Sequence, residues 1–217
     1  MDEFDKLNAR IVNCKKCPRL ANYVRKVAKE KVKRFNDWEY WGRPLTGFGD
    51  PDAGLLVIGL APAAHGGNRT GRMFTGDCSG DWLVKALYEY GYANQPVSVK
   101  KDDGLQLRNA YITAIIRCAP PANKPTKQEI ENCSLYLSEE LKLLKNVRVV
   151  LTLGTLAFKT YISMFNIKGL KFVHGALYDL NDVKLVASYH PSRQNTQTGK
   201  LKWHEWVSVF TKIRQIL

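Results

Sequence analysis

The segment LLVIGLAPAAHGGNRTGRMFTGD, residues 55–77, decides the fold class of this chain. Its first four residues are all apolar, which is typical of a strand buried on both faces, and Gly59 ends the apolar run. The loop that follows is rich in Gly, Ala and Pro and carries only a few polar side chains. Open α/β sheets bind ligands where such strands end, so this loop predicts a binding site.

Three further apolar runs have the length of buried strands, and helical patterns separate them. We expect strands at 55–60, 110–116, 148–153 and 184–189. We expect helices at 81–90, 126–145, 156–166 and 201–217, and a further helix around a ligand turn within 1–35. Alternating strands and helices predict an α/β fold with a parallel sheet between helical layers.

The composition limits the protein to a few classes. With 217 residues, 45% of them hydrophobic, the chain suits one domain spanning residues 1–217. It has no apolar run of about 18 residues and no signal-peptide pattern at its start, so we expect no membrane span and a cytoplasmic location. The net charge of +13 favours a polyanionic partner such as nucleic acid, although a basic surface kept for solubility is the alternative.

The five cysteines indicate metal binding more than disulfide bonds. An odd number without an export signal argues against a disulfide framework. Cys14 and Cys17 form a close pair next to Pro18, whereas Cys118 and Cys133 lie further apart in sequence. From spacing alone an iron–sulfur cluster is slightly favoured over zinc, and four unrelated thiols remain an alternative. We interpret the remaining cysteine, Cys78, as a buried residue without a chemical role, with a thiol of lowered pKa at the start of a helix as the alternative.

Polar loops follow three of the four expected strands. In a parallel sheet the carboxyl ends of such strands share one edge. We therefore expect four polar residues of these loops to converge there: His65, Asp77, Asn123 and His190.

Three motifs carry a resemblance to a known family. They are GLAPAAHGGNRTGRMFTGD at 59–77, CAPPANKPT at 118–126 and SYHPSRQNTQTG at 188–199. Together with the early pair of cysteines they resemble the uracil-DNA glycosylase superfamily, and within it the family 5 or type B enzymes. The resemblance covers roughly residues 10 to 215. It implies a three-layer α/β/α sandwich on a four-stranded parallel sheet, and a [4Fe–4S] cluster held by Cys14, Cys17, Cys118 and Cys133.

Two positions depart from the better-known members of the superfamily. Ala63 stands near the place of a carboxylate or amide that positions the attacking water, and Ala114 stands where an Asn reads the edge of uracil. Family 5 shares both departures and is associated with a broader set of damaged bases. A pocket with fewer fixed hydrogen-bond partners rejects fewer bases. The alanines at these two positions are therefore consistent with the broader set of damaged bases.

The resemblance implies glycosylase chemistry, in which a base is flipped out of DNA before its N-glycosidic bond is cleaved. We expect Phe74 to stack on the base, unless it is a core aromatic, and His190 to donate a hydrogen bond to the base carbonyl. Asp77 is the candidate for orienting water or stabilising the sugar cation, and an N-cap is its alternative role. Asn123 is a third candidate catalytic residue, with a turn as the alternative.

The DNA contacts are expected on the polar loops that follow the first and the last of the four strands. His65 is expected at the base edge or at a phosphate. Six residues complete the predicted surface, the last four of them as a wedge and backbone clamp: Asn68, Arg69, Ser192, Arg193, Gln194 and Asn195.

The sequence thus predicts a monomeric DNA glycosylase that excises uracil and other deaminated bases from DNA. The competing hypothesis is an iron–sulfur nucleic-acid-binding protein without catalysis, which the apolar residue at Ala63 would favour. A nucleotide-binding enzyme is disfavoured, because the loop after the first strand lacks both glycine-rich phosphate motifs.

Overall fold

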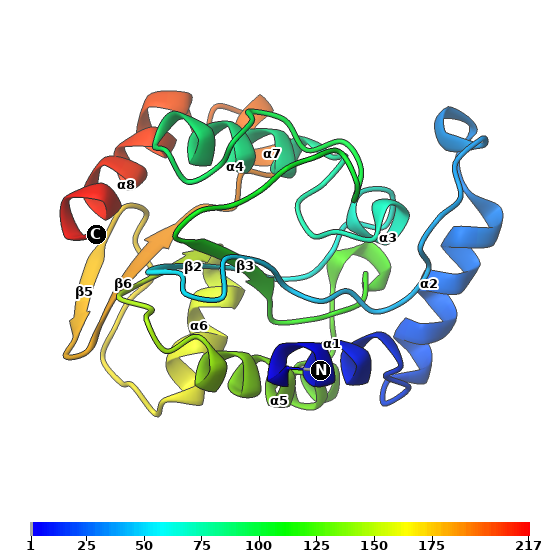
Figure 1. Ribbon diagram of the computed structural model, residues 1–217, viewed down its shortest axis with the longest axis horizontal. Helices are drawn as coiled ribbons and strands as arrows, with labels where there is room; N and C mark the ends of the chain where they lie inside the picture. The colour runs from blue at the N-terminus through cyan, green and yellow to red at the C-terminus, as the bar shows by residue number, and fades with distance from the viewer. Residues whose placement is uncertain (1) are drawn as a thin grey trace.

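A computed structural model describes residues 2–217. It contains one six-stranded sheet in the order β1-β3-β2-β4-β6-β5. The four central strands are β3 (Ala110–Ala114), β2 (Leu55–Gly59), β4 (Val149–Leu153) and β6 (Val183–Ser188), and they are mutually parallel. The predicted four-stranded parallel sheet and α/β class are confirmed (Figure 1).

Two short antiparallel strands extend the sheet beyond the prediction. β1 (Phe48–Gly49) pairs with β3, and β5 (Leu177–Leu180) pairs with β6. β1 has only two residues, and β5 alternates between exposed and half-buried positions. Neither strand forms the continuous apolar run by which the central strands were found.

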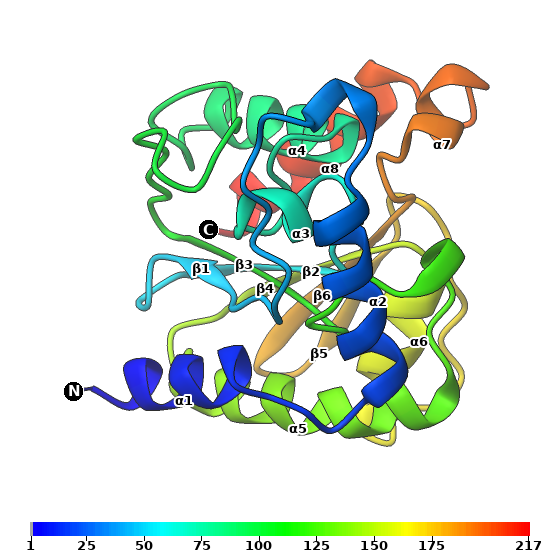
Figure 2. The ribbon, with the colours of Figure 1, turned by 90° about the vertical axis from the view of Figure 1, so that its right-hand side faces the viewer.

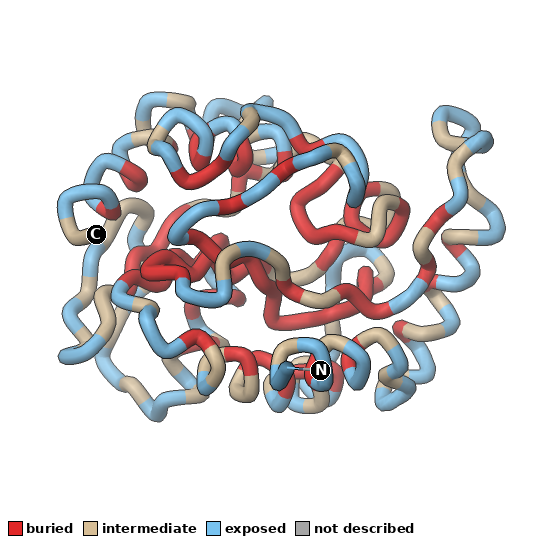
Figure 3. The backbone as a smooth tube through the Cα atoms, in the orientation of Figure 1, coloured by how far each residue is buried: buried red, intermediate tan, exposed pale blue. Residues whose placement is uncertain are grey.

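Helices cover both faces of the sheet. Alternate residues of the central strands point to opposite faces. On one face Leu55 and Val57 pack with α4 (Cys78–Glu89) and α8 (Trp203–Ile216). On the other, Leu56 and Ile58 pack with α2 (Pro18–Glu30), α5 (Lys127–Leu143) and α6 (Thr155–Met164). Figure 3 shows the buried backbone running through the middle of this sandwich.

The N-terminal region is not one helix. α1 (Glu3–Val12) packs on α5 through Leu7 and Ile11, and a turn with the first two cysteines leads into α2. The turn η1 (Lys33–Phe35) follows α2, and three short elements complete the chain: α3 (Gly67–Thr70), η2 (Pro121–Asn123) and α7 (Arg193–Gln197). Within residues 2–217 no helix combines the length and apolar character needed to cross a membrane.

Local sequence signals explain most helix boundaries. Thr126 caps α5, and its capping box with Glu129 is present as predicted. α4 begins at Cys78, three residues earlier than expected, because the side chain of Asp77 caps it.

A buried polar network joins β3 to α5. Arg117 forms an ion pair with Glu140 in which both side chains are almost fully buried. Thr113 Oγ1 donates to Glu140 at 2.6 Å and accepts from Arg117 Nη1 at 2.7 Å. A buried charge is tolerated only when it is paired, so each partner depends on the other.

We expect Glu140→Ala to lower the free energy of unfolding by about 3 to 5 kcal/mol, because it leaves the Arg117 charge buried and unpaired. Glu139→Ala is the matched control. Glu139 is the neighbouring residue, and its ion pair with Arg10 lies at the surface, where pairs contribute little. Urea unfolding of both variants measures the difference, and equal effects would contradict this view of the network.

Candidate active site

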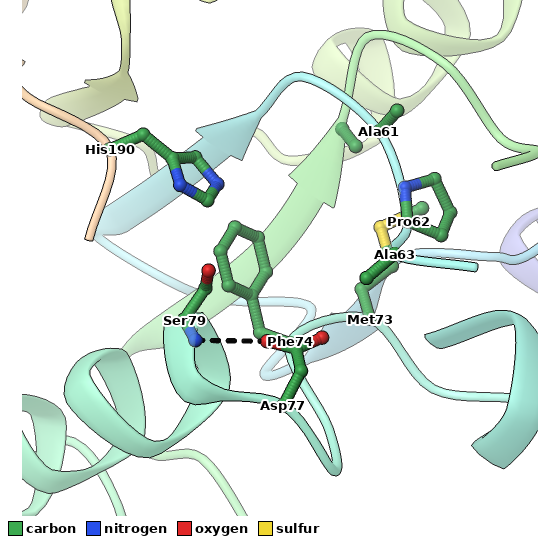
Figure 4. Close-up of a pocket in the computed structure, with 9 residues that line it drawn as sticks. Ala61, Pro62, Ala63, Met73, Phe74, Asp77, Ser79 and His190 are labelled. Atoms are coloured by element: carbon green, nitrogen blue, oxygen red, sulfur yellow. Dashed lines mark hydrogen bonds between the residues drawn. The ribbon is translucent and has the colours of Figure 1, made fainter. Parts of the chain in front are cut away.

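The candidate site lies where β2, β3 and β6 end. Here a small pocket opens between the loop after β2, the start of α4 and the loop after β6 (Figure 4). Its lining is Ala61, Pro62, Ala63, Met73, Phe74, Asp77, Ser79, Ala114 and His190. Its volume is about 30 Å³, which is close to the space of one water molecule.

Phe74 and His190 form one wall of this pocket. Their rings stack with centroids 5.8 Å apart and an angle of 29° between the planes. Phe74 has a positive φ of 50°, which is strained for a bulky residue and fixes the direction of its ring. A Cβ at Gly59 would lie 2.7 Å from Phe74 Cζ, so only glycine at the end of β2 leaves room for the ring.

His190 is neutral in this setting. Burial lowers the pKa of His190 to about 4, so the ring has one N–H donor and one acceptor nitrogen at neutral pH. Its backbone oxygen accepts a hydrogen bond from Asn195 Nδ2 at 2.8 Å. The side-chain amide of Asn195 therefore supports the His190 loop, whereas the sequence predicted a DNA contact.

Asp77 has the capping role that the sequence offered as its alternative, and it also lies at the pocket. Its Oδ1 caps α4 by accepting from the backbone N–H groups of Ser79 and Gly80, both at 3.0 Å. The same carboxyl group lines the pocket, and a Cβ at Gly66 would lie 2.0 Å from Oδ2. Burial raises the pKa of Asp77 against the lowering effect of the two capping bonds. The cap holds one oxygen, and the other faces the neighbouring loop.

Ala63 and Ala114 line the pocket as predicted and leave it poor in fixed polar groups. Among its lining residues only Asp77, Ser79 and His190 have polar side chains. Ser79 was missed at the sequence level, because the helix was expected to begin only at residue 81 and Ser79 stood in the segment before it. Figure 4 shows its hydroxyl directed toward the space beside Phe74 and His190.

A larger groove of about 1010 Å³ leads to the pocket, and the two share Ala63, Asp77 and Ser79. The groove collects most of the remaining predicted residues, which do not reach the inner pocket: His65, Arg69, Asn123, Ser192, Arg193 and Gln194. Arg193 and Gln194 are exposed on its rim, and Ser192 caps α7 by accepting from Asn195 N.

His65 and Asn123 lie on the groove instead of in the pocket. His65 Nδ1 is hydrogen-bonded to the hydroxyl of Tyr40 at 3.1 Å, and burial lowers its pKa. Asn123 is exposed in the turn η2 with a φ of 55°, which is the turn role that the sequence offered as its alternative. The sequence correctly predicted the edge of the sheet at which both residues lie. It did not predict that they lie outside the pocket.

The expected DNA contact through Asn68 is wrong. Asn68 is fully buried, and its Nδ2 donates to the backbone oxygens of Val24 and Ala64 at 3.3 and 3.4 Å. The side chain thus ties the loop after β2 to helix α2. In the sequence it looked available because the surrounding loop is polar and rich in glycine.

Arg69 is also a structural residue. Only 3% of it is exposed, and its guanidinium lies 3.8 Å from the centre of the Phe35 ring and 3.9 Å from that of Trp38. It donates to the backbone oxygens of His65 and Gly76. The expected DNA contact is contradicted by this burial, because the aromatic residues of the η1 turn cover the charge.

The four predicted cluster ligands gather between α1, α2, β3 and α5. Cys118 and Cys133 are buried, whereas Cys14 and Cys17 are half-buried. Burial raises the pKa of Cys118 well above its ordinary value, and the charges of Cys133, Cys14 and Cys17 raise it further. That mutual influence indicates that the four sulfurs are neighbours.

No three His, Cys, Asp or Glu side chains in residues 2–217 are arranged to hold a metal ion. A single zinc ion would need such a group. In an iron–sulfur cluster each thiolate is attached to the cluster instead of to one shared ion, so the two sites differ in ligand spacing. The [4Fe–4S] cluster stays a prediction.

Comparisons with known proteins agree with the fold class. Residues 46–212 match the model of the uracil DNA glycosylase superfamily, and the chain therefore belongs to this superfamily. It is 47% identical over 198 residues to a type-5 uracil-DNA glycosylase of Pyrobaculum aerophilum, covering 91% of this chain and 86% of the relative. It is 45% identical over 206 residues to the type-5 enzyme of Thermus thermophilus, covering 94% and 93%.

A type-4 uracil-DNA glycosylase of Pyrobaculum aerophilum is only 28% identical over 197 residues, covering 88% of this chain and 83% of the relative. The difference places the chain with the type-5 group, as its motifs indicated.

The low pKa of His190 predicts a pH-dependent contribution to stability. Below pH 6.5 the unfolded chain binds a proton at His190, whereas the folded protein does not bind one until the pH approaches 4. The stability of the native protein relative to His190→Asn should therefore fall by on the order of 2 kcal/mol between pH 7 and pH 5. Urea unfolding at both pH values measures it, with the exposed His204→Asn as control. A difference that does not change with pH would contradict a His190 ring that stays neutral in the folded protein.

Proposed function

We propose that this protein excises uracil and other deaminated bases from DNA by hydrolysing the N-glycosidic bond. The observation that carries the proposal is the pocket in which Phe74, a neutral His190 and the capped Asp77 meet at the end of the sheet. The relatives named type-5 uracil-DNA glycosylases support it. None of the matches described above favours a non-catalytic nucleic-acid-binding protein.

Base flipping brings the target nucleotide through the groove to the pocket. The pocket has room for about one water molecule, so a base enters only if the rings of Phe74 and His190 move apart. Phe74 then offers a flat surface on which the base stacks. The positive side chains Arg34 and Arg193 line the groove and attract the phosphate backbone, beside the acidic Asp77 and Asp81.

Bond cleavage leaves negative charge on the departing base and positive charge on the sugar. The N–H group of neutral His190 donates to the base carbonyl, where the negative charge develops. The Asp77 oxygen that is free of the helix cap orients the attacking water or stabilises the sugar cation. Asn123 has no place in this chemistry and is assigned to the rim of the groove.

The apolar lining explains a broad choice of base. Ala63 and Ala114 offer no side-chain hydrogen bond that a wrong base would leave unpaired. The hydroxyl of Ser79 can rotate, so it can donate to a carbonyl or accept from an N–H group.

We further propose that Cys14, Cys17, Cys118 and Cys133 hold a [4Fe–4S] cluster. The chemistry of the donors fits, because four neighbouring thiols lie together and Asn132 Nδ2 donates to Cys17 Sγ at 3.4 Å. When bound, the cluster would supply a covalent link between α1, α2, β3 and α5. None of the four cysteines lines the pocket or the groove, so we assign the cluster a structural role.

We expect native protein to release uracil from an oligonucleotide, which alkali then cleaves at the abasic site. His190→Ala should lower the single-turnover rate by about 100-fold or more, because one donor to the developing charge is lost. Affinity for undamaged duplex should change little. His204→Ala, at an exposed position on α8, is the control. If affinity and rate fell together, His190 would have a role in binding and not in catalysis.

For the cluster, we expect protein purified without oxygen to contain about four iron atoms per chain and a broad visible absorbance band. Cys118→Ala should lose both signals and unfold at a lower temperature, whereas Cys78→Ala should keep them. Zinc in place of iron by elemental analysis would refute the proposal.

A further inference from the structure

Two valines lie exposed at the tip of the loop formed by residues 94–104. Val97 is 51% exposed and Val99 is 52% exposed. They are two residues apart and are followed by the exposed Lys100 and Lys101. The neighbouring cations make this loop a candidate contact for an anionic partner.

The loop is held by a buried ion pair. Arg72 is 7% exposed and contacts both oxygens of Asp103, at 2.8 and 2.9 Å. The same guanidinium donates to the backbone oxygen of Lys101 at 3.0 Å and to Ser98 Oγ at 2.8 Å. One arginine from the pocket loop therefore organises the base of the 94–104 loop.

Asp103 fixes the tip from the other side. Its carboxylate accepts from the backbone N–H groups of Val99, Lys100 and Leu105, at 2.7, 3.2 and 3.1 Å. Burial by itself would raise the pKa of Asp103, but the bonds from Arg72 and the backbone outweigh it and hold the pKa below its ordinary value. The loop is thus bonded in a shape that keeps both valines outside the core.

The loop is also tied to the pocket. The N–H of Gly76 donates to Ser98 O at 2.8 Å, and the hydroxyls of Ser98 and Thr75 share a hydrogen bond of 2.7 Å. Thr75 and Gly76 lie between Phe74 and Asp77 in the chain, so the loop has a fixed position relative to the base-stacking ring. A loop that only bridged two elements would not need these bonds.

Val99 lines the groove together with Ser98, and residues of α7 line it as well. Figure 2 shows the green loop at the upper left and α7 at the upper right, on the same side of the sheet. A nucleotide that passes down the groove therefore leaves its duplex with the 94–104 loop nearby. An extruded nucleotide leaves a gap in the base stack, and proteins fill such gaps with apolar side chains.

We infer that the 94–104 loop is a second DNA-contacting element, in addition to Arg193 and Gln194 on the rim of the groove. Val97 and Val99 pack against the base step beside the extruded nucleotide. Lys100 and Lys101 contact the phosphates. Lys100 leaves its exposed ion pair with Asp102, in which Nζ lies 3.6 Å from Oδ1, to do so. The inference rests on the proposed function, because it requires DNA as the substrate.

The test compares duplex and single-stranded substrates, because only a duplex has a stack to be opened and filled. The variant carries Val97→Ser together with Val99→Ser, and Val173→Ser is the control, an exposed valine that belongs neither to the 94–104 loop nor to the groove. We expect the double variant to lower the single-turnover rate on a uracil-containing duplex about tenfold or more. Its rate on the same oligonucleotide as a single strand should stay within about twofold of the native rate, as expected for a pocket that is unchanged.

Two outcomes would overturn the inference. Unchanged rates on both substrates would show that the valines contact no DNA, and equal losses on both would show that they support only the pocket. If native protein released no base from either strand, the proposed function would fail separately. In that case a binding measurement tests whether the 94–104 loop contacts DNA. Replacing both lysines, Lys100→Gln with Lys101→Gln, should lower the slope of log affinity against log salt concentration for duplex DNA by about two. Lys168→Gln with Lys171→Gln is the matched control, and equal slopes would exclude a phosphate contact by the loop.

Discussion

The carboxylate of Asp77 is the contact on which the site depends. One oxygen accepts two backbone N–H groups at the start of α4, which sets where that helix begins and therefore where Ser79 lies. The group is close to Gly66, where any side chain would collide with it. Helix position, loop path and pocket shape are consequently linked through one carboxyl group. Burial raises its pKa, and the helix cap counteracts that rise, so the cap also helps to keep the group ionised.

Because the pocket has few polar side chains, each of them accounts for a large share of the hydrogen bonds that a bound base could form there. Because burial lowers the pKa of His190, the ring remains neutral, and its N–H is the donor that the proposed mechanism assigns to the developing negative charge. The strained backbone of Phe74 directs its ring against Gly59 and His190. The small size of the pocket implies that these rings separate when a base enters, so binding and rearrangement are coupled.

Several charged and polar side chains near the groove serve the fold instead of the ligand. Asn68 and Arg69 connect the loop after β2 to α2 and to the η1 turn, and Arg72 connects it to the 94–104 loop. These bonds make a glycine-rich segment rigid, although its composition suggests flexibility. The groove is thereby bordered by segments far apart in sequence, each fixed to the same loop.

Sequence patterns were enough to predict the four parallel strands, their order along the chain, the capped α5 and the edge of the sheet at which the site forms. Continuous apolar runs and capping residues are local signals, and the carboxyl ends of parallel strands must share an edge. The sequence also singled out Phe74, Asp77, His190, Ala63 and Ala114, because motif positions carry them. Only the tertiary structure decided that Asn68 and Arg69 are buried, that Asn123 and His65 stop at the groove, and that Ser79 reaches the pocket. Burial and hydrogen-bond partners depend on segments that are distant in sequence, and a polar residue in a loop looks the same whether it faces DNA or the backbone of a helix.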